Sequence, residues 1–213
     1  MVVVCVQVNQ GVSRHHYLAV LQANAGRSRM GDERRWTAAL VEHETVVRAF
    51  LTACQGVASA DWQRAPAPGK WSPAAVVLHV CQAYELGRDS VAGGPSMRLR
   101  VAPPVAWFSR TLILPVILAT KRFPRGATAP AEIVPDAAEA RLLLPNAAAT
   151  RVQRVSEQAA AALRRAAGQR PVPRLTHAYF GALNPLATLR LLSAHTRHHA
   201  RRLNSGVIQQ QLS

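Results

Sequence analysis

Apolar residues recur at spacings of three and four along four separate segments of the chain. This period places them on one face of an α-helix, whereas a half-buried strand would need strict alternation. Strand-like runs are few, and no internal repeat is present. The pattern therefore predicts an all-α fold, a four-helix bundle. The expected helices are residues 32–55, 73–87, 136–168, with an interruption at Pro145, and 185–204.

Three of these helices have recognisable start signals. Ser72 is placed to cap the second helix, and Pro73 suits its first position, where no backbone N–H is needed. Asn184 and Pro185 repeat this arrangement at the last helix, and Asp136 opens the third. The termini of the expected bundle are thus specified locally.

The rest of the chain is organised around this bundle. Residues 1–29 are expected to be a poorly ordered extension, residues 30–206 the bundle domain and residues 207–213 a tail, with Met30 a candidate biological start. Residues 93–135 are rich in Pro, Gly and Arg and predict a long connection. A helix is expected within it around residues 106–120, where Pro115 would kink or split it.

The charge and the cysteine content limit the classes of binding partner and the cellular compartment. The 26 basic and 11 acidic residues give a net charge of +15, almost all of it from arginine. No basic stretch carries an aromatic ladder or a glycine-flanked RNA-binding signature, which argues against nucleic acid as the partner. Three cysteines at irregular spacing favour a reducing compartment, the cytoplasm. The longest uncharged apolar stretch, Thr111–Thr120, is far shorter than the roughly 20 residues of a membrane-spanning helix, so we expect no transmembrane segment and at most a surface association.

Histidines are the residues most suggestive of chemistry. His195 and His199 lie four residues apart, on the face of the last helix that also carries Leu192 and Leu203. Two imidazoles so placed could clamp a transition metal, or could be ordinary core histidines. His79 lies on the apolar stripe of the second helix, and three buried imidazoles without partners would carry a desolvation cost that a shared metal removes.

Other side chains near these positions have more ordinary interpretations. His198 is expected to face solvent or an anion, because it lies about 100° around the helix from His199. His43 is expected to be a core histidine or to support a metal ligand. Cys81 points away from the face of His79 and is expected to pack in the core.

These residues resemble a known family. Trp71-Ser72-Pro73 followed by His79, then His195-x-x-x-His199 near the C-terminus, is similar to the DinB-like superfamily of helical metalloproteins. The segment from His177 to Leu183 resembles a branch of it described only as a domain of unknown function. The resemblance implies a bundle with up-up-down-down topology, a long crossover between helices two and three, and a divalent metal (Zn, Ni or Fe) held by His79, His195 and His199.

The chain departs from that branch at two places. Arg202 stands where the branch commonly has Gln, and Leu186–Thr188 stand where it has an acidic-aromatic pair. The departures leave the three histidines intact and concern only their surroundings.

The expected function is therefore a metal-dependent enzyme. Three neutral histidines leave at least one coordination position open, which is typical of catalytic sites. The resemblance implies hydrolase or thiol S-transferase chemistry on an unidentified small substrate, for example a low-molecular-weight thiol. Glu85, Glu42 and Glu44 are the candidate general bases. The arginines of residues 98–125, together with Arg197 and Arg202, could receive an anionic substrate or an acidic thiol, or could form a solvated basic surface. The alternative is a non-catalytic basic binding protein for nucleic acid or an anionic surface, with a vestigial histidine cluster; a homodimer is compatible with either.

Overall fold

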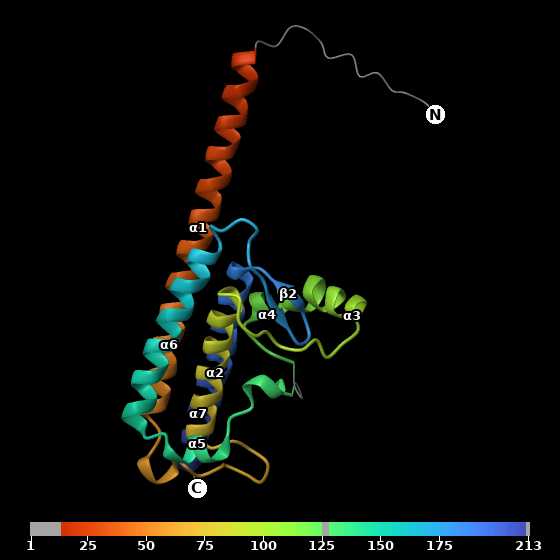
Figure 1. Cartoon of the computed structure of the whole chain (residues 1–213). Coiled ribbons are helices and arrows are strands. Elements are labelled where there is room, and N and C mark those ends of the chain that lie inside the picture. The colour runs from red at the N-terminus through yellow and green to blue at the C-terminus, as the bar shows by residue number, and fades with distance from the viewer. Residues whose placement is uncertain (1–13, 125–127, 212–213) are drawn as a thin grey trace. The chain divides into compact units, whose positions relative to one another are not determined.

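The chain is mostly helical in a computed structural model, which describes residues 14–124 and 128–211. It divides into two units, residues 1–38 and 39–213. Helices and strands are labelled in Figure 1. The four longest helices are α1 (Arg14–Gln55), α2 (Pro73–Val91), α6 (Pro145–Ala166) and α7 (Pro185–Gln211). The all-α class predicted from the periodicity is confirmed.

The described part of the first unit is a continuous helix, the first half of α1. An ion pair on its surface joins Arg35 to Asp32 at 2.6 Å. The predicted helix start at Asp32 was wrong, because helical residues reach back to Arg14. The apolar spacing that marks a buried stripe begins only near Trp36, so periodicity misses a helix that continues beyond it. The short β-type run at residues 2–8 lies outside the described residues, and the predicted domain limits at residues 30 and 206 stay predictions.

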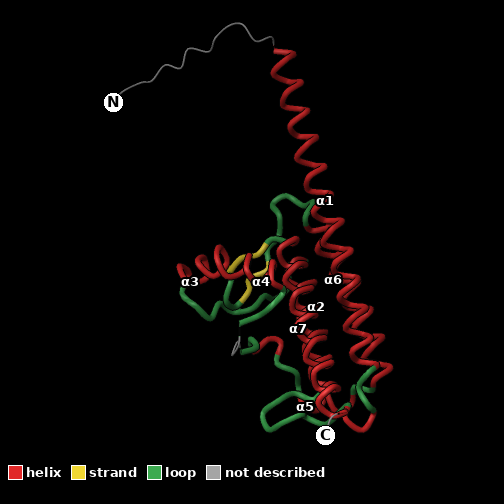
Figure 2. The backbone as a smooth tube through the Cα atoms, turned by 180° about the vertical axis from the view of Figure 1, so that it is seen from behind, coloured by secondary structure: helices red, strands yellow, loops and turns green. Residues whose placement is uncertain are grey.

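The second unit is built on the packing of α2, α6 and α7, which contact one another in pairs. Figures 1 and 2 show these helices running side by side from opposite viewpoints. Their shared core contains Leu78 and Tyr84 of α2, Leu163 of α6 and Leu189 of α7, all fully buried. This apolar packing fixes the positions of the histidine-bearing faces of α2 and α7.

The predicted capping signals are confirmed by hydrogen bonds. Ser72 Oγ accepts a bond from the backbone N–H of Ala75 at 3.3 Å, and Pro73 is the first residue of α2. Asn184 Oδ1 accepts from the N–H of Ala187 at 2.8 Å at the start of α7. These side chains satisfy backbone donors that a helix leaves unpaired at its first turn.

The predicted third helix is two helices. Asp136 caps α5 (Ala137–Leu142) by accepting from two backbone N–H groups. The chain then bends at Leu143 and Leu144, and α6 begins at Pro145. The interruption follows from Pro145, since the residue before a proline is disfavoured in the helical conformation.

The connection between α2 and α5 contains more regular structure than expected. Its longest helical run comprises α3 (Pro103–Phe108), a π-helical turn η2 (Ser109–Ile113) and α4 (Leu114–Thr120). Short 3-10 turns occur at η1 (Ser59–Asp61), before α2, and at η3 (Ala131–Ile133). The helix expected around residues 106–120 is present, and Pro115 falls in the first turn of α4.

This run is also the one described helix that is long and apolar enough to be a candidate membrane span. Pro103–Thr120 has 18 residues and a mean hydropathy of 1.3, and 22% of it is buried. Sequence reasoning limited the apolar stretch to Thr111–Thr120 because Arg110 interrupts it. The structure joins both sides of Arg110 into one helical run.

A two-stranded hairpin was not predicted. Strands β1 (Leu175–His177) and β2 (Gly181–Leu183) pair antiparallel, with Thr176 opposite Ala182. Gly181 adopts a φ of 64°, a left-handed conformation that glycine reaches without strain. Three residues per strand are too few for alternation to be recognised in a sequence.

Candidate metal centre

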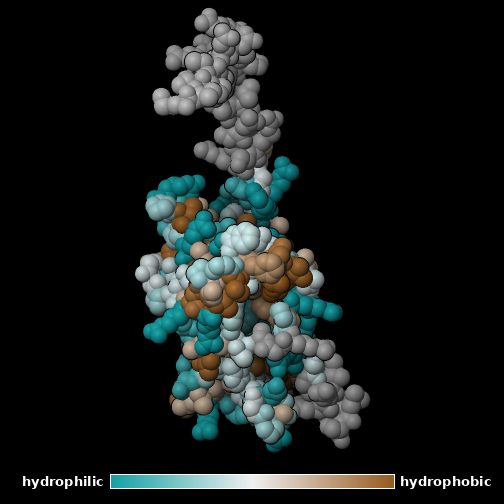
Figure 3. Space-filling view, turned by 90° about the vertical axis from the view of Figure 1, so that its right-hand side faces the viewer, coloured by the Kyte–Doolittle hydropathy of each residue, from teal (hydrophilic) through white to brown (hydrophobic). Residues whose placement is uncertain are grey.

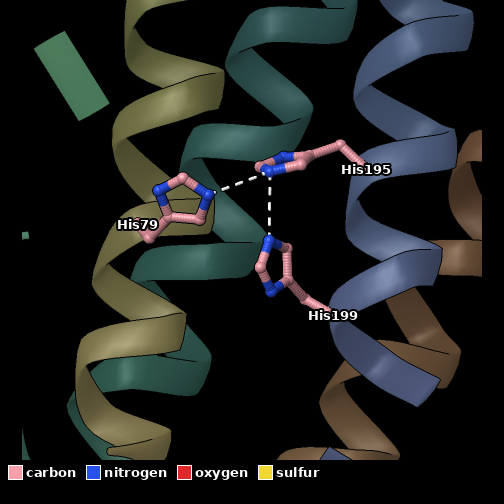
Figure 4. A group of neighbouring side chains, drawn as sticks. All are labelled: His79, His195 and His199. Atoms are coloured by element: carbon pink, nitrogen blue, oxygen red, sulfur yellow. Dashed lines mark hydrogen bonds between the residues drawn. The ribbon is translucent and has the colours of Figure 1, made fainter. Parts of the chain in front are cut away.

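Three imidazoles from two helices meet inside the second unit. His79 lies in the first half of α2, and His195 and His199 lie one turn apart on α7. Figure 4 shows their rings pointing toward a common point between the two helices. The packing of α2 against α7 thus brings together residues separated by more than one hundred positions in the chain.

The ring nitrogens that face one another are all Nε2. His79 Nε2 lies 2.9 Å from His195 Nε2, and His199 Nε2 lies 3.1 Å from His195 Nε2. One ligand atom from each residue lies within 4.8 Å of the other two. Two imidazole nitrogens bound to one zinc ion at about 2.0–2.1 Å in tetrahedral geometry lie about 3.3 Å apart. The observed spacing is therefore close to that of a three-histidine metal centre.

A second contact sets the tautomer of His79. Its Nδ1 lies 2.6 Å from the carbonyl oxygen of Ile133, which can only accept, so Nδ1 carries the proton. The Nε2 atom of neutral His79 then presents a lone pair to the cluster. A carbonyl partner on the far nitrogen is the arrangement that usually orients metal-bound histidines.

Neutral imidazoles alone do not satisfy this cluster. His195 Nε2 carries at most one proton, so it can donate to His79 or accept from His199, but it cannot do both. At most one of the two close contacts can then be a well-aligned hydrogen bond, and the other brings two ring nitrogens together without one. A cation bound by all three nitrogens removes this conflict, so the donor set fits a divalent metal.

Burial keeps these imidazoles in the form that binds metal. The pKa values of His195 and His199 are lowered well below the ordinary value, first by burial and then by the neighbouring histidines. The pKa of His79 is lowered by burial against the opposing effect of the Ile133 carbonyl. Because metal ions bind neutral histidine, the site needs little further deprotonation near neutral pH.

Aromatic rings surround the cluster. The Trp71 ring centroid lies 4.7 Å from that of His79, and Phe123 lies 6.0 Å from His195. Apolar rings so close to the cluster lower the local dielectric, which strengthens electrostatic interactions at the centre. Trp71 belongs to the motif that the sequence singled out; Phe123 is in the connection and had no role assigned from its local pattern.

A cavity of about 1240 Å³ opens beside the histidines. Its wall combines apolar side chains with a few polar groups. The polar or titratable lining includes Asp61, Arg64, Lys70, His177, Tyr179, His198 and Arg202. A largely apolar space with a few polar groups next to a candidate metal centre is typical of a small-molecule site.

His177 is a cavity residue that sequence reasoning did not assign a role. Its Nδ1 accepts the backbone N–H of Tyr179 at 3.2 Å, so neutral His177 carries its proton on Nε2. Burial lowers its pKa to about 4. The ring stacks on Phe180 with centroids 4.6 Å apart. Its place beside the hairpin turn, rather than any spacing rule, brings it into the cavity wall.

The carboxylates expected to act as general bases do not line this cavity. Glu85 pairs with Arg151 at 3.2 Å, and Glu42 pairs with Lys121 at 2.7 Å and also with Arg197. Glu44 is exposed and lines a separate hollow beside His43. Asp61, paired with Arg64 at 3.3 Å, is the one carboxylate among the described lining residues. The arginine and lysine partners of Glu85 and Glu42 are distant in the sequence, so these ion pairs could not be predicted from it.

The other singled-out residues divide between core and cavity. His43 is 3% exposed, lies edge-on to Tyr84 and is a core histidine. His198 is half-buried and lines the cavity, with its ring centroid 5.6 Å from that of Phe123, so it faces solvent less than expected. Arg202 lines the cavity. Cys81 is fully buried, as its predicted packing role requires.

The protein is thus a helical protein whose three facing imidazoles are compatible with divalent metal binding. Comparison with known families then identifies it further. The DinB superfamily matches residues 42–203, a range that includes all three histidines, and the chain belongs to that superfamily. No curated protein and no solved structure gives a significant match.

Proposed function

We propose that this protein is a metal-dependent enzyme that holds a divalent ion, Zn, Ni or Fe, on His79, His195 and His199 and acts on a small molecule in the adjoining cavity. The observation that carries the proposal is the convergence of three Nε2 atoms at 2.9 and 3.1 Å beside that cavity. Superfamily membership supports it. The same proposal includes the up-up-down-down arrangement of the bundle, with the long crossover between its second and third principal helices.

The ion would supply Lewis-acid activation of a water or a thiol, which corresponds to hydrolase or thiol S-transferase chemistry. The protein's own residues have separate tasks. The Ile133 carbonyl holds the His79 ring in orientation through Nδ1, and Trp71 and Phe123 lower the local dielectric. Arg202 and Lys70 give the cavity a positive charge suited to an acidic substrate or thiol.

His177 is the candidate hydrogen-bond donor of the cavity. Its Nε2–H is set by the Tyr179 backbone contact, and its ring is held in place by Phe180. Burial lowers its pKa to about 4, so it stays neutral at pH 7 and could donate a hydrogen bond to a substrate oxygen. We further propose that the enzyme works in the cytoplasm and that it can form a homodimer.

The test is elemental analysis by inductively coupled plasma mass spectrometry of the full chain after reconstitution. We expect about one divalent ion per chain in the wild type and a large loss in His195→Ala. His198→Ala is the matched control, because it removes a neighbouring cavity imidazole that is outside the three-histidine cluster. Stoichiometric metal in a triple variant lacking His79, His195 and His199 would overturn the proposal.

Assays of the metal-loaded protein then distinguish hydrolase from thiol S-transferase activity. Ester and amide panels test hydrolysis, and paired thiol and electrophile panels test transfer. Activity that needs both a loaded site and an added thiol would identify a thiol S-transferase. No metal in any variant would instead favour the basic binding protein, whose affinity for an anionic polymer should fall steeply with salt.

A further inference from the structure

A row of apolar side chains stands exposed on the helical run from α3 to α4. Val105, Trp107, Phe108, Leu112 and Val116 are between 50% and 59% exposed, and we call them the apolar ridge. Val105, Phe108, Leu112 and Val116 recur at spacings of three and four, so they share one face of the helix. Figure 3 shows hydrophobic surface gathered on the side of the molecule where α3 and α4 lie. Contiguous apolar surface of this kind marks an interaction site.

The opposite face of the same run is anchored in the core. Leu114, Ile117 and Leu118 are buried in a cluster with Phe180 and Leu183. Arg110 donates a hydrogen bond to the carbonyl of Ala182 in β2 at 3.1 Å. The run is therefore part of the folded unit, and crossing a bilayer would require pulling its buried face out of that unit. At 1.5 Å per residue its 18 residues span about 27 Å, shorter than the roughly 30 Å hydrocarbon core.

Positive charge flanks the ridge at both ends. Residues 98–122 contain four arginines and one lysine, with no acidic residue. Arg98 and Arg100 are exposed before α3, and Arg122 is exposed after α4. Arg201 donates to the carbonyl of Lys121, which adds another guanidinium at the end of α4.

Two acids offset part of this charge without reversing it. Glu132 accepts the backbone N–H of Arg98 at 2.8 Å and lies near Arg100, and Glu42 pairs with Lys121 at 2.7 Å. The net charge around the ridge remains positive.

These two properties together select one kind of partner. A nucleic acid would meet the arginines but leave the ridge uncovered. A second copy in a symmetric contact would bring the same cations face to face, which opposes association. An anionic bilayer complements both the apolar ridge and the positive charge, because acyl chains contact the ridge while headgroup phosphates contact the flanking arginines. Trp and Phe are also the aromatic residues that settle readily at a membrane interface.

We propose that the apolar ridge docks this protein on the surface of an anionic phospholipid bilayer, with α3 and α4 lying in the plane of the interface. The flanking arginines then bind the headgroups, and the folded unit stays in water. The same helical run contributes Ser109, Ile113 and Ile117 to the cavity wall. Docking therefore places the bilayer against a helical run that lines the cavity beside the candidate metal centre.

The test is vesicle flotation with the full chain, using vesicles of phosphatidylglycerol and phosphatidylcholine in equal parts and vesicles of phosphatidylcholine alone. We expect binding to the anionic vesicles, at least about tenfold weaker binding to the neutral ones, and loss when salt is raised from about 0.05 M to about 0.5 M. Trp107 emission should shift to the blue on binding, because Trp107 is exposed on the ridge. Of the other three tryptophans, Trp36 and Trp62 are buried and Trp71 is half-buried against His79.

The Phe108→Ser/Val116→Ser variant should weaken binding to anionic vesicles by about tenfold or more. The matched control is Leu142→Ser/Leu144→Ser, which removes side chains 80% and 65% exposed outside the ridge. Thermal melts and metal content establish that both variants are folded and that the candidate metal centre is unaffected, so failure here is distinct from failure of the proposed enzyme function.

Two results would overturn the proposal. One is wild-type protein that does not float with anionic vesicles at low salt. The other is a ridge variant that floats like the wild type; if light scattering shows that this variant loses only a dimer, the ridge is a self-association surface.

Discussion

Acid should destabilise this protein through His43, a histidine outside the metal cluster. His43 is 3% exposed, and its Nε2 is buried without a hydrogen-bond partner in the described structure. Burial lowers its pKa to about 4, against the model-peptide value of 6.5. The unfolded chain therefore binds a proton more readily than the folded chain between these values, so stability falls as pH falls through this window.

The size of the effect follows from linkage. A pKa of 4 in the folded state and 6.5 in the unfolded state make the free energy of unfolding about 2.4 kcal/mol smaller at pH 4.5 than at pH 7. The His43→Leu variant lacks this contribution. We expect its loss of stability between the two pH values to be smaller than that of the wild type by about this amount.

Urea unfolding at pH 7 and pH 4.5, with a chelator present, measures the difference. His177, whose pKa burial also lowers to about 4, is present in both proteins and cancels. Arg48→Gln is the control, because Arg48 is exposed on the same helix and its replacement leaves His43 in place. Equal pH-dependent losses in the wild type and His43→Leu, within about 0.5 kcal/mol, would refute the reasoning.

Three further predictions concern the metal, the thiols and the hairpin. Zinc at a hundred times its Kd should raise the wild-type Tm by about 5–10 °C in a thermal shift assay and leave that of His195→Ala unchanged; an equal shift in both would contradict the assigned ligands. Burial raises the pKa of Cys54 and of Cys81 to about 12, so iodoacetamide at pH 8 should modify neither until the protein is denatured, as peptide mapping would show. Gly181→Ala should cost about 1 kcal/mol in urea unfolding, because its φ of 64° strains any other L-residue while the new Cβ meets Ala106 at an ordinary 3.6 Å; an unchanged midpoint would count against this.

The helices show how far local patterns reach. The caps Ser72, Asn184 and Asp136 were predictable because capping depends on residues within one turn of the helix start. The beginning of α1 at Arg14 was not, because the sequence before Trp36 carries no sustained apolar stripe from which a helix could be recognised.

At the candidate metal centre, too, some features were predictable from the sequence and others depended on tertiary packing. The sequence by itself determined that His195 and His199 share a helix face, since their spacing is one turn, and it singled out His79 because that residue lies on an apolar stripe. The facing of their Nε2 atoms, the Ile133 carbonyl behind His79 and the place of His177 in the cavity wall were decided by tertiary packing. So were the ion pairs that engage Glu42 and Glu85, and the exposure of the apolar ridge. Periodicity records which face of a helix is apolar, whereas only the packing of distant segments decides which groups meet on that face and which apolar face stays uncovered.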